Sequence, residues 1–390
     1  MTTTALPEPT TAPPDETEIG GRLDRVRARM REEGLDLLVV VDPHSVYYLT
    51  NFANYVHERP FVLVVPLEGS PRMVVPLLER QHVEVRSVGA IELVSYYEFP
   101  APAGEKWTDR FHEVVDGATA VGVESNCPLY VIDELDGNHH RSDIVEDVRM
   151  IKSDYEIGRM VHAAQVVSDA HASVMAAVKP GDTMATLAGA ASSAMRARTL
   201  ADMPNANLLA SSFGAAIQPP MLSDDPHNFT DVFAVMEEGG PHVSVINSVV
   251  NGYGAEIERT FFLNTVPDAA HEPFEVMMEA RRTAFDLTVP GASMAGVDQA
   301  VREVFVRHGC LDRVVHRTGH SFGVTGHEGP FLAISYDHEI EPGMVFSIEP
   351  GIYFAGLGGF RHSDTVLVTE TGNVSLTTAP DSLDDLLFAR

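Results

Sequence analysis

The most regular pattern of apolar and polar positions runs from His242 to Phe262. Its β-branched valines predict a strand, Asn251-Gly252 is a strong hairpin-turn signal, and strand character resumes after the turn. Residues two apart on a strand share a face, so Glu256 and Glu258 point the same way. Such a pair is either solvated together or buried together for a function, and this stretch by itself leaves both interpretations open.

The first part of the chain predicts a disordered tail over residues 1–18 and an α/β domain over 19–147. An amphipathic helix ending at Gly34 is followed by a buried strand over Leu35–Val41 and a turn at Asp42-Pro43. Further strand-like segments occupy 61–69, 71–79, 91–99 and 118–125.

The pattern changes near Val148, where we expect a second domain over 148–390. One helix is predicted from Val148 until Lys179-Pro180-Gly181 stops it. The rest predicts a largely antiparallel sheet with helices outside it, so the whole domain is of the α+β class. Its other helices are predicted at Met184–Arg198, Glu272–Val289 and Met294–His308, and its last strands at 343–354 and 364–372.

Composition narrows the class of protein. The formal net charge of −29 disfavours nucleic acid and anionic membranes as partners. No apolar run is long enough for a membrane span, and the first residues do not resemble a signal peptide. The only cysteines, Cys127 and Cys310, are far apart, which suits a reducing compartment. We therefore expect a cytoplasmic protein.

Candidate catalytic and binding residues lie in four later segments of the chain. His227 sits in a turn-rich loop, and His316, His320 and His327 lie among glycines, where a ligand can approach the backbone. A lone buried histidine is more often a hydrogen-bonded core residue than a catalyst. Glu349 is different, because burying a carboxylate in so apolar a strand costs several kcal/mol unless it is paired. The fourth segment leads into the last strand with Arg361, His362 and Asp364.

Taken together, the segments resemble the pita-bread superfamily of methionine aminopeptidases, aminopeptidase P, prolidase and creatinase. The resemblance rests on Ile151-Lys152-Ser153, GHSFG, HEGP, EPGMVFSIEPGIY and GGFR followed by DTVLV, in that order, over nearly the whole chain. It implies an α/β creatinase-type N-terminal domain and an α+β pita-bread catalytic domain.

The superfamily's metallopeptidases hold two divalent metals with two Asp, one His and two Glu. In this sequence the first Asp position is Val245, the second is Glu256, and the last Glu position is Ser363. His320 and Glu349 keep the His and the first Glu positions. The resemblance therefore implies that the usual dinuclear centre is lost, and the expectation is that the protein needs no cofactor.

Creatinase, which works without metal, is the closer match in residue types. The resemblance makes His227 the general acid/base and Glu258 and Glu349 the clamp for a substrate cation, with His320 and His327 orienting water. It implies a homodimer in which Arg59 reaches across to the substrate. The further substrate-binding candidates are Tyr253, Glu256, Phe331 and Arg361, the last with a structural role as an alternative.

The resulting hypothesis is a metal-independent, creatinase-like amidinohydrolase that cleaves a C–N bond in a small cationic carboxylate. The first alternative is a metal-dependent Xaa-Pro peptidase in which Glu256, His320 and Glu349 hold a single ion. A lyase acting on an onium compound and a binding module that lost catalysis are the others. Metal content separates the first alternative from the hypothesis, and reaction products identify a lyase.

Overall fold

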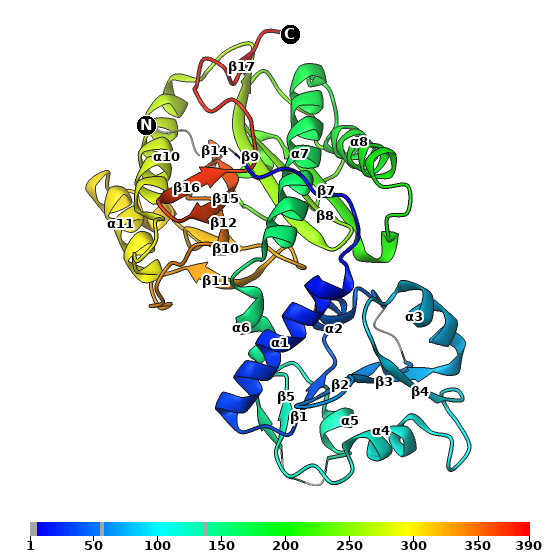
Figure 1. Cartoon of the computed structure of the whole chain (residues 1–390). Helices are drawn as coiled ribbons and strands as arrows, with labels where there is room; N and C mark the ends of the chain where they lie inside the picture. The colour runs from blue at the N-terminus through cyan, green and yellow to red at the C-terminus, as the bar shows by residue number, and fades with distance from the viewer. Residues whose placement is uncertain (1–5, 55–57, 136, 138) are drawn as a thin grey trace. The chain divides into compact units, whose positions relative to one another are not determined.

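The computed structural model describes residues 6–54, 58–135, 137 and 139–390, drawn in colour in Figure 1. It divides into two compact units, one over Ala12–Arg149 and one over Met150–Arg390 together with the residues up to Thr11. Residues 1–5 of the predicted tail and residues 55–57 lie outside the described part. The first helix begins at Glu16, inside the stretch predicted as a tail. In the described part, no helix has the length and apolar character that a bilayer crossing requires.

The first unit is an α/β structure around one mixed sheet with the strand order β4-β3-β2-β1-β5-β6. Central strand β1 is antiparallel to β2 and parallel to β5. The four strand-like segments of the sequence form β2, β3, β4 and β5. The strands are β1 Leu37–Val40, β2 Val62–Pro66, β3 Arg72–Pro76, β4 Glu92–Tyr96, β5 Val121–Val123 and β6 His139–Arg141.

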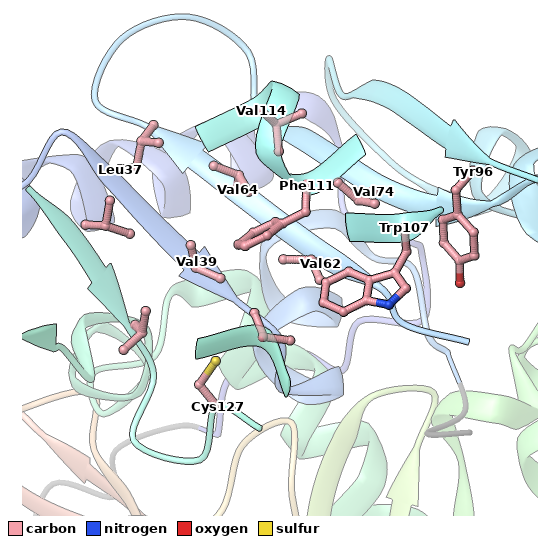
Figure 2. Packing of buried hydrophobic residues seen from close by; sticks show 13 residues of the cluster. Leu37, Val39, Val62, Val64, Val74, Tyr96, Trp107, Phe111, Val114 and Cys127 are labelled. Carbon is pink, nitrogen blue, oxygen red and sulfur yellow. The ribbon is translucent and has the colours of Figure 1, made fainter. Parts of the chain in front are cut away.

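One apolar core lies between this sheet and α4. Figure 2 shows Trp107 and Phe111 of α4 packed with Val62, Val64 and Val74 of the sheet, all of them buried. The helices are α1 Glu16–Glu33, α2 Pro43–Thr50, α3 Arg80–Arg86, α4 Trp107–Val115, α5 Leu129–Ile132 and α6 Ile144–Arg149, with a 3-10 turn η1 at Leu77–Glu79.

Asp42-Pro43 does not form the predicted turn but starts helix α2. The Asp42 carboxylate accepts hydrogen bonds from the backbone N–H groups of His44 and Ser45, and Pro43 is the first helical residue. Both residues are favoured at a helix start, because an Asp oxygen satisfies free N–H groups and proline lacks one. The same dipeptide therefore suits a turn and a helix start equally well.

The second unit is built around a long sheet with the strand order β11-β10-β12-β15-β9-β8-β7. Its neighbouring strands along this order are antiparallel, as predicted, while β16 joins β15 and β17 joins β9. The strands are β7 Ser212–Gln218, β8 Gly239–Val250, β9 Tyr253–Leu263, β10 Gly319–Ser321, β11 Glu328–Leu332, β12 Val345–Ile348, β15 Ser363–Thr369, β16 Gly372–Ser375 and β17 Leu387–Phe388, with a separate pair β13 Gly351–Phe354 and β14 Gly358–Arg361.

Helices pack against both halves of this sheet. Helices α7 and α8 contact β7, β8 and β9, whereas α10 and α11 contact strands of the other half, as Figure 1 shows. The helices are α7 Asp154–Ala177, α8 Met184–Asp202, α9 Pro220–Ser223, α10 Asp268–Leu287 and α11 Met294–Arg307, with 3-10 turns η2 Leu208–Ala210 and η3 Leu311–Arg313.

The helix predicted from Val148 onward is two helices. Helix α6 ends at Arg149 and α7 begins at Asp154. The Ser153 hydroxyl accepts a hydrogen bond from the Glu156 backbone N–H, and the Glu156 carboxylate accepts one from the Ser153 N–H. This reciprocal capping starts a new helix where apolar spacing alone suggested a continuous one.

The hairpin predicted between His242 and Phe262 is confirmed. Strands β8 and β9 meet at Asn251 and Gly252, whose φ angles are 46° and 93°. Positive φ at both central residues gives the turn a twist that matches a hairpin, and Asn-Gly is the dipeptide that tolerates it best. This hairpin is the frame on which the candidate site is built.

Candidate metal centre

Glu256 and Glu258 lie on one face of β9, and both are buried, with 4% and 2% of their surfaces exposed. The solvated interpretation of the pair is therefore wrong. Across the sheet, Glu258 is directly opposite Val245 of β8 on one side and Ser363 of β15 on the other. Opposite residues in antiparallel strands share a face, so these four side chains line the same surface of the sheet.

Three potential ligands converge on this face. One side-chain atom each from Glu256, His320 and Glu349 lies within 4.8 Å of the other two. The Nε2 atom of His320 is 3.4 Å from Oε1 of Glu349. Glu349 follows β12, and its backbone N–H donates to the Thr318 carbonyl, which fixes it beside β10. Glu256 and His320 are brought together by the strand order β10-β12-β15-β9, and Glu349 is added by its backbone bond to Thr318.

His320 is arranged as a neutral metal ligand. Its Nδ1 atom lies 3.0 Å from the Ser321 carbonyl oxygen, and only a protonated Nδ1 can donate there. Burial lowers the pKa of His320 to about 4, so at neutral pH Nε2 keeps its lone pair. Nε2 is buried and has no hydrogen-bond partner in the described part of the chain. A backbone acceptor on Nδ1 is the usual way to orient a metal-binding imidazole.

Two serines orient Glu256. Oε1 of Glu256 is 2.9 Å from the Ser363 hydroxyl and 3.2 Å from the Ser347 hydroxyl, and the two hydroxyls are 2.7 Å apart. Each hydroxyl has one proton, so two of these three contacts can be hydrogen bonds at a time. Because the serines contact Oε1, the other carboxylate oxygen remains available to a ligand.

Burial and neighbouring negative charges disfavour the ionised form of Glu349. Its burial, followed by the charges of Glu256 and Glu258, raises the pKa of the Glu349 carboxyl well above its usual value. Two carboxylates and an imidazole lone pair are all acceptors, so their close approach is unfavourable until a cation or a proton lies between them.

These residues fit one divalent cation and do not fit two. Two carboxylates and one neutral imidazole form an oxygen-nitrogen donor set suited to a divalent first-row metal. A second ion would need further carboxylates on the same face, where the chain has Val245 and Ser363. The donor set therefore suits a centre with one metal ion.

Glu258 is already paired inside the protein. Its Oε2 atom lies 2.6 Å from Nε of Arg361, and both side chains are buried. Burial raises the pKa of Glu258 to about 8, although the Arg361 charge acts in the opposite direction. Arg361 also donates to the Tyr353 hydroxyl, whose oxygen lies 2.7 Å from Nε2 of His316. The carboxylate expected to clamp a substrate cation therefore faces the chain's own guanidinium.

The model of metallopeptidase family M24 matches residues 158–370, and that of the creatinase/prolidase N-terminal domain matches residues 22–151. The chain belongs to metallopeptidase family M24.

Individual relatives of this M24 protein carry peptidase names. A Mycobacterium tuberculosis protein named Probable dipeptidase PepE is 29% identical over 93% of the chain and 95% of its own length. The Xaa-Pro dipeptidase of Pyrococcus furiosus is 24% identical over 91% and 97%. The crystal structure of dipeptidase PepE from Mycobacterium ulcerans has a TM-score of 0.84 at 27% identity, covering 97% of this chain and 100% of that one.

The expected fold is confirmed, and the expected reaction is wrong. A creatinase/prolidase N-terminal domain followed by an M24 domain is the predicted architecture. The matched family is one of metallopeptidases and the relatives are named dipeptidases, which overturns the metal-independent, creatinase-like amidinohydrolase. The broader expectation that the protein is a hydrolase agrees with these relatives. Two of the five ligand positions are lost, but Glu256, His320 and Glu349 still lie together.

The other predicted catalytic histidines lie near the centre. His327 stacks on His320 with the ring centroids 3.9 Å apart. His227 is exposed on the loop before β8, and its charge lowers the pKa of both His316 and His327, so it lies within electrostatic reach of them. Phe331 of β11 is directly opposite His320 of β10. The catalytic roles of these residues stay predictions.

Two predicted substrate-binding residues have other contacts. Tyr253 stands at the hairpin turn, where its hydroxyl lies 3.5 Å from the Glu156 carboxylate of α7. Arg59 belongs to the first unit and pairs there with Glu98 at 2.6 Å and with Glu58. The homodimer in which Arg59 crosses the interface stays a prediction.

Asp364 and His362 lie on the opposite face of the sheet. The Asp364 carboxylate accepts from Arg259 at 2.9 Å and from Arg281 at 2.5 Å, and all three side chains are largely buried. The ring of His362 packs edge-on against Phe274. The polar residues of the segment 361–364 are therefore divided, with Arg361 on the side of the metal centre and His362 and Asp364 on the opposite side.

Arg317 was not among the predicted site residues. This residue lies between His316 and the start of β10, and its guanidinium lies over the ring of Phe331, 4.7 Å from the centroid. An arginine in a glycine-rich segment has no periodicity that marks it. The available signal was its position three residues before His320, a predicted site residue.

Proposed function

We propose that the protein is a metal-dependent hydrolase that cleaves dipeptides, with Xaa-Pro dipeptides as its first candidate substrates. One divalent ion would be held by Glu256, His320 and Glu349. The observation that carries the proposal is the convergence of these three acceptors within 4.8 Å of one another, with Nδ1 of His320 directed at the Ser321 carbonyl and Nε2 left for a ligand. The dipeptidase names of the relatives support the substrate class.

The ion, when bound, would polarise the scissile carbonyl and supply a water of lowered pKa. The chain's own residues prepare its position. The Ser321 carbonyl holds His320 in the required tautomer, and the hydroxyls of Ser347 and Ser363 hold Glu256 in place. A centre built in advance in this way avoids the cost of ordering side chains when the substrate binds.

Proton transfer is assigned to Glu349 and His227. A bound ion would keep the Glu349 carboxylate ionised, so this carboxylate could accept the proton of the attacking water. Imidazole exchanges protons near neutral pH, and His227 would deliver a proton to the leaving nitrogen. Its exposed loop position leaves room for it to approach a bound substrate.

Arg361 and Glu258 would act as a positioning pair. The guanidinium is held at two points, because Nε faces Glu258 and one terminal nitrogen donates to Tyr353, whose hydroxyl is itself held by His316. A permanent cation so fixed partly offsets the negative charge of the neighbouring glutamates. The centre then carries a charge that one divalent ion can balance.

Hydrolysis assays test the proposal. Protein purified without chelator should release free amino acids from Ala-Pro or related dipeptides, lose that activity in chelator, and regain it with Mn²⁺, Co²⁺ or Zn²⁺. A panel of Xaa-Pro, Xaa-Ala and longer peptides defines the substrate range. Activity that is unaffected by complete metal removal would contradict the proposal.

A further inference from the structure

Arg317 has no anionic partner among the residues that the structure describes. Its side chain forms neither a hydrogen bond nor an ion pair there, and its Nε atom is buried without a hydrogen-bond partner. Two other arginines behave differently, since Arg361 pairs with Glu258 and Arg313 with Asp312. A partly buried guanidinium without a counter-ion is unusual in a chain of net charge −29.

Phe331 sets the orientation of this guanidinium. The Arg317 guanidinium carbon lies 4.7 Å from the Phe331 ring centroid, which places the cation over the ring. The Phe331 ring is in turn packed edge-on with Tyr336 at 5.4 Å. Stacking uses the flat face of a guanidinium and leaves its N–H edge free to donate, which suits the binding of a carboxylate through two hydrogen bonds.

The guanidinium also lies within reach of the metal centre. Phe331 and His320 are directly opposite on β11 and β10, so their side chains share the face that carries the centre. The charge of Arg317 contributes to lowering the pKa values of His320 and His327 and opposes the raised pKa of Glu349. Arg317 is therefore the cation that a substrate bound at the centre would meet beside Phe331.

We infer that Arg317, stacked on Phe331, is the subsite that binds a carboxylate of the substrate. The inference rests on the proposed function and specifies which substrates it selects. A dipeptide can offer this group as its free C-terminal carboxylate or as an acidic side chain. The dipeptide length itself points to the first source, because the C-terminal carboxylate lies only one residue beyond the bond that is cleaved.

The test compares matched substrates in matched variants. Ala-Pro against Ala-Pro amide tests the C-terminal carboxylate, and Glu-Pro against Gln-Pro tests the side chain. The variants are Arg317→Gln, Arg317→Lys and the control Arg313→Gln, since Arg313 also lies over a phenylalanine, with its guanidinium 5.6 Å from the ring of Phe354. Metal content and circular dichroism confirm that each variant is folded and loaded.

The wild type should prefer Ala-Pro over Ala-Pro amide by about tenfold or more, mainly through a lower KM for Ala-Pro. Arg317→Gln should remove this preference, Arg317→Lys should keep part of it, and Arg313→Gln should keep it in full. If the Glu-Pro preference is lost instead, the carboxylate bound is that of the side chain. If Arg317→Gln leaves both preferences unchanged, the inference is overturned.

Calorimetry separates this inference from the proposed function. L-proline and L-prolinamide are titrated into the metal-loaded wild type and Arg317→Gln. Proline binding that depends on Arg317, with no dipeptide cleaved, would support the subsite and contradict the peptidase. Dipeptide cleavage with acid and amide equally reduced by Arg317→Gln would support the peptidase and contradict the subsite.

Discussion

Val245 and Glu258 lie directly opposite each other on strands β8 and β9, and their side chains share the face of the metal centre. Position 245 is where the resemblance to dinuclear metallopeptidases implies a ligating Asp. In this chain the carboxylate opposite that position is Glu258, which contacts Arg361 at 2.6 Å. Glu258 is therefore a carboxylate beside the metal centre that is paired with the guanidinium of Arg361.

Restoring the two lost carboxylates should restore a second ion. In Val245→Asp/Ser363→Glu the face gains two oxygen donors beside Glu256 and Glu349, and we expect about two ions per chain instead of one. The measurement is metal analysis by mass spectrometry after dialysis against excess Mn²⁺ or Zn²⁺. Val245→Asn/Ser363→Gln is the matched control, because it adds similar volume without charge. A stoichiometry that stays at one in the carboxylate variant would show that the two positions do not limit the number of ions.

His227→Ala tests the assigned proton donor. General acid catalysis contributes about 10²–10⁴-fold, so kcat should fall by at least tenfold on the best dipeptide while the metal content stays unchanged. His308→Ala is the control, since His308 pairs with Glu279 at the end of α11, in contact with no residue of the centre in the described structure. Retention of more than about a tenth of wild-type turnover in His227→Ala would exclude the role.

The fold was predictable because its signals are local. The Asn251-Gly252 turn and the valines before it define the hairpin, and a carboxylate such as Glu349 in an otherwise apolar segment indicates a site. The reaction was not predictable in the same way. Whether three ligands still make a centre depends on their distances across strands β9, β10 and β12, and the sequence does not contain these distances.

Pairing between residues far apart in the sequence accounts for the remaining differences between the predicted and the observed site. Glu258 was expected to face a substrate, and only the return of the chain through β14 shows that Arg361 reaches it first. The role of Arg317 likewise depends on Phe331, which strand pairing places opposite His320. Ser153 could have been recognised, because Ser followed by Glu three residues later is a helix-start signal inside the predicted long helix.

Stability of the first unit should depend on the protonation of Glu124. This buried carboxylate accepts hydrogen bonds from the backbone N–H groups of Val41 and Asp42, and its burial raises its pKa to about 7. Because this pKa is higher in the folded than in the unfolded state, Glu124 makes its full contribution to stability at pH values below its unfolded pKa of about 4.3. That contribution is lost as the pH rises through about 7.

Glu124→Gln removes this titration. The variant and the wild type should have similar free energies of unfolding near pH 5, and the variant should be more stable by about 2–3 kcal/mol near pH 8. Urea unfolding of the full chain at both pH values gives the comparison, with the exposed Glu92→Gln as a control. A difference between variant and wild type that does not change with pH would contradict the buried, proton-binding carboxylate.

The central claim is one divalent ion per chain at Glu256, His320 and Glu349, and metal analysis of chelator-free protein tests it most directly. We expect about one equivalent of a divalent first-row metal in the wild type and in the control Glu341→Gln, whose side chain is exposed. Glu256→Gln, His320→Ala and Glu349→Gln should each lose most of it. A wild type that binds no ion above background after dialysis against Mn²⁺, Co²⁺ or Zn²⁺, or that binds one ion regardless of these three substitutions, would contradict the account.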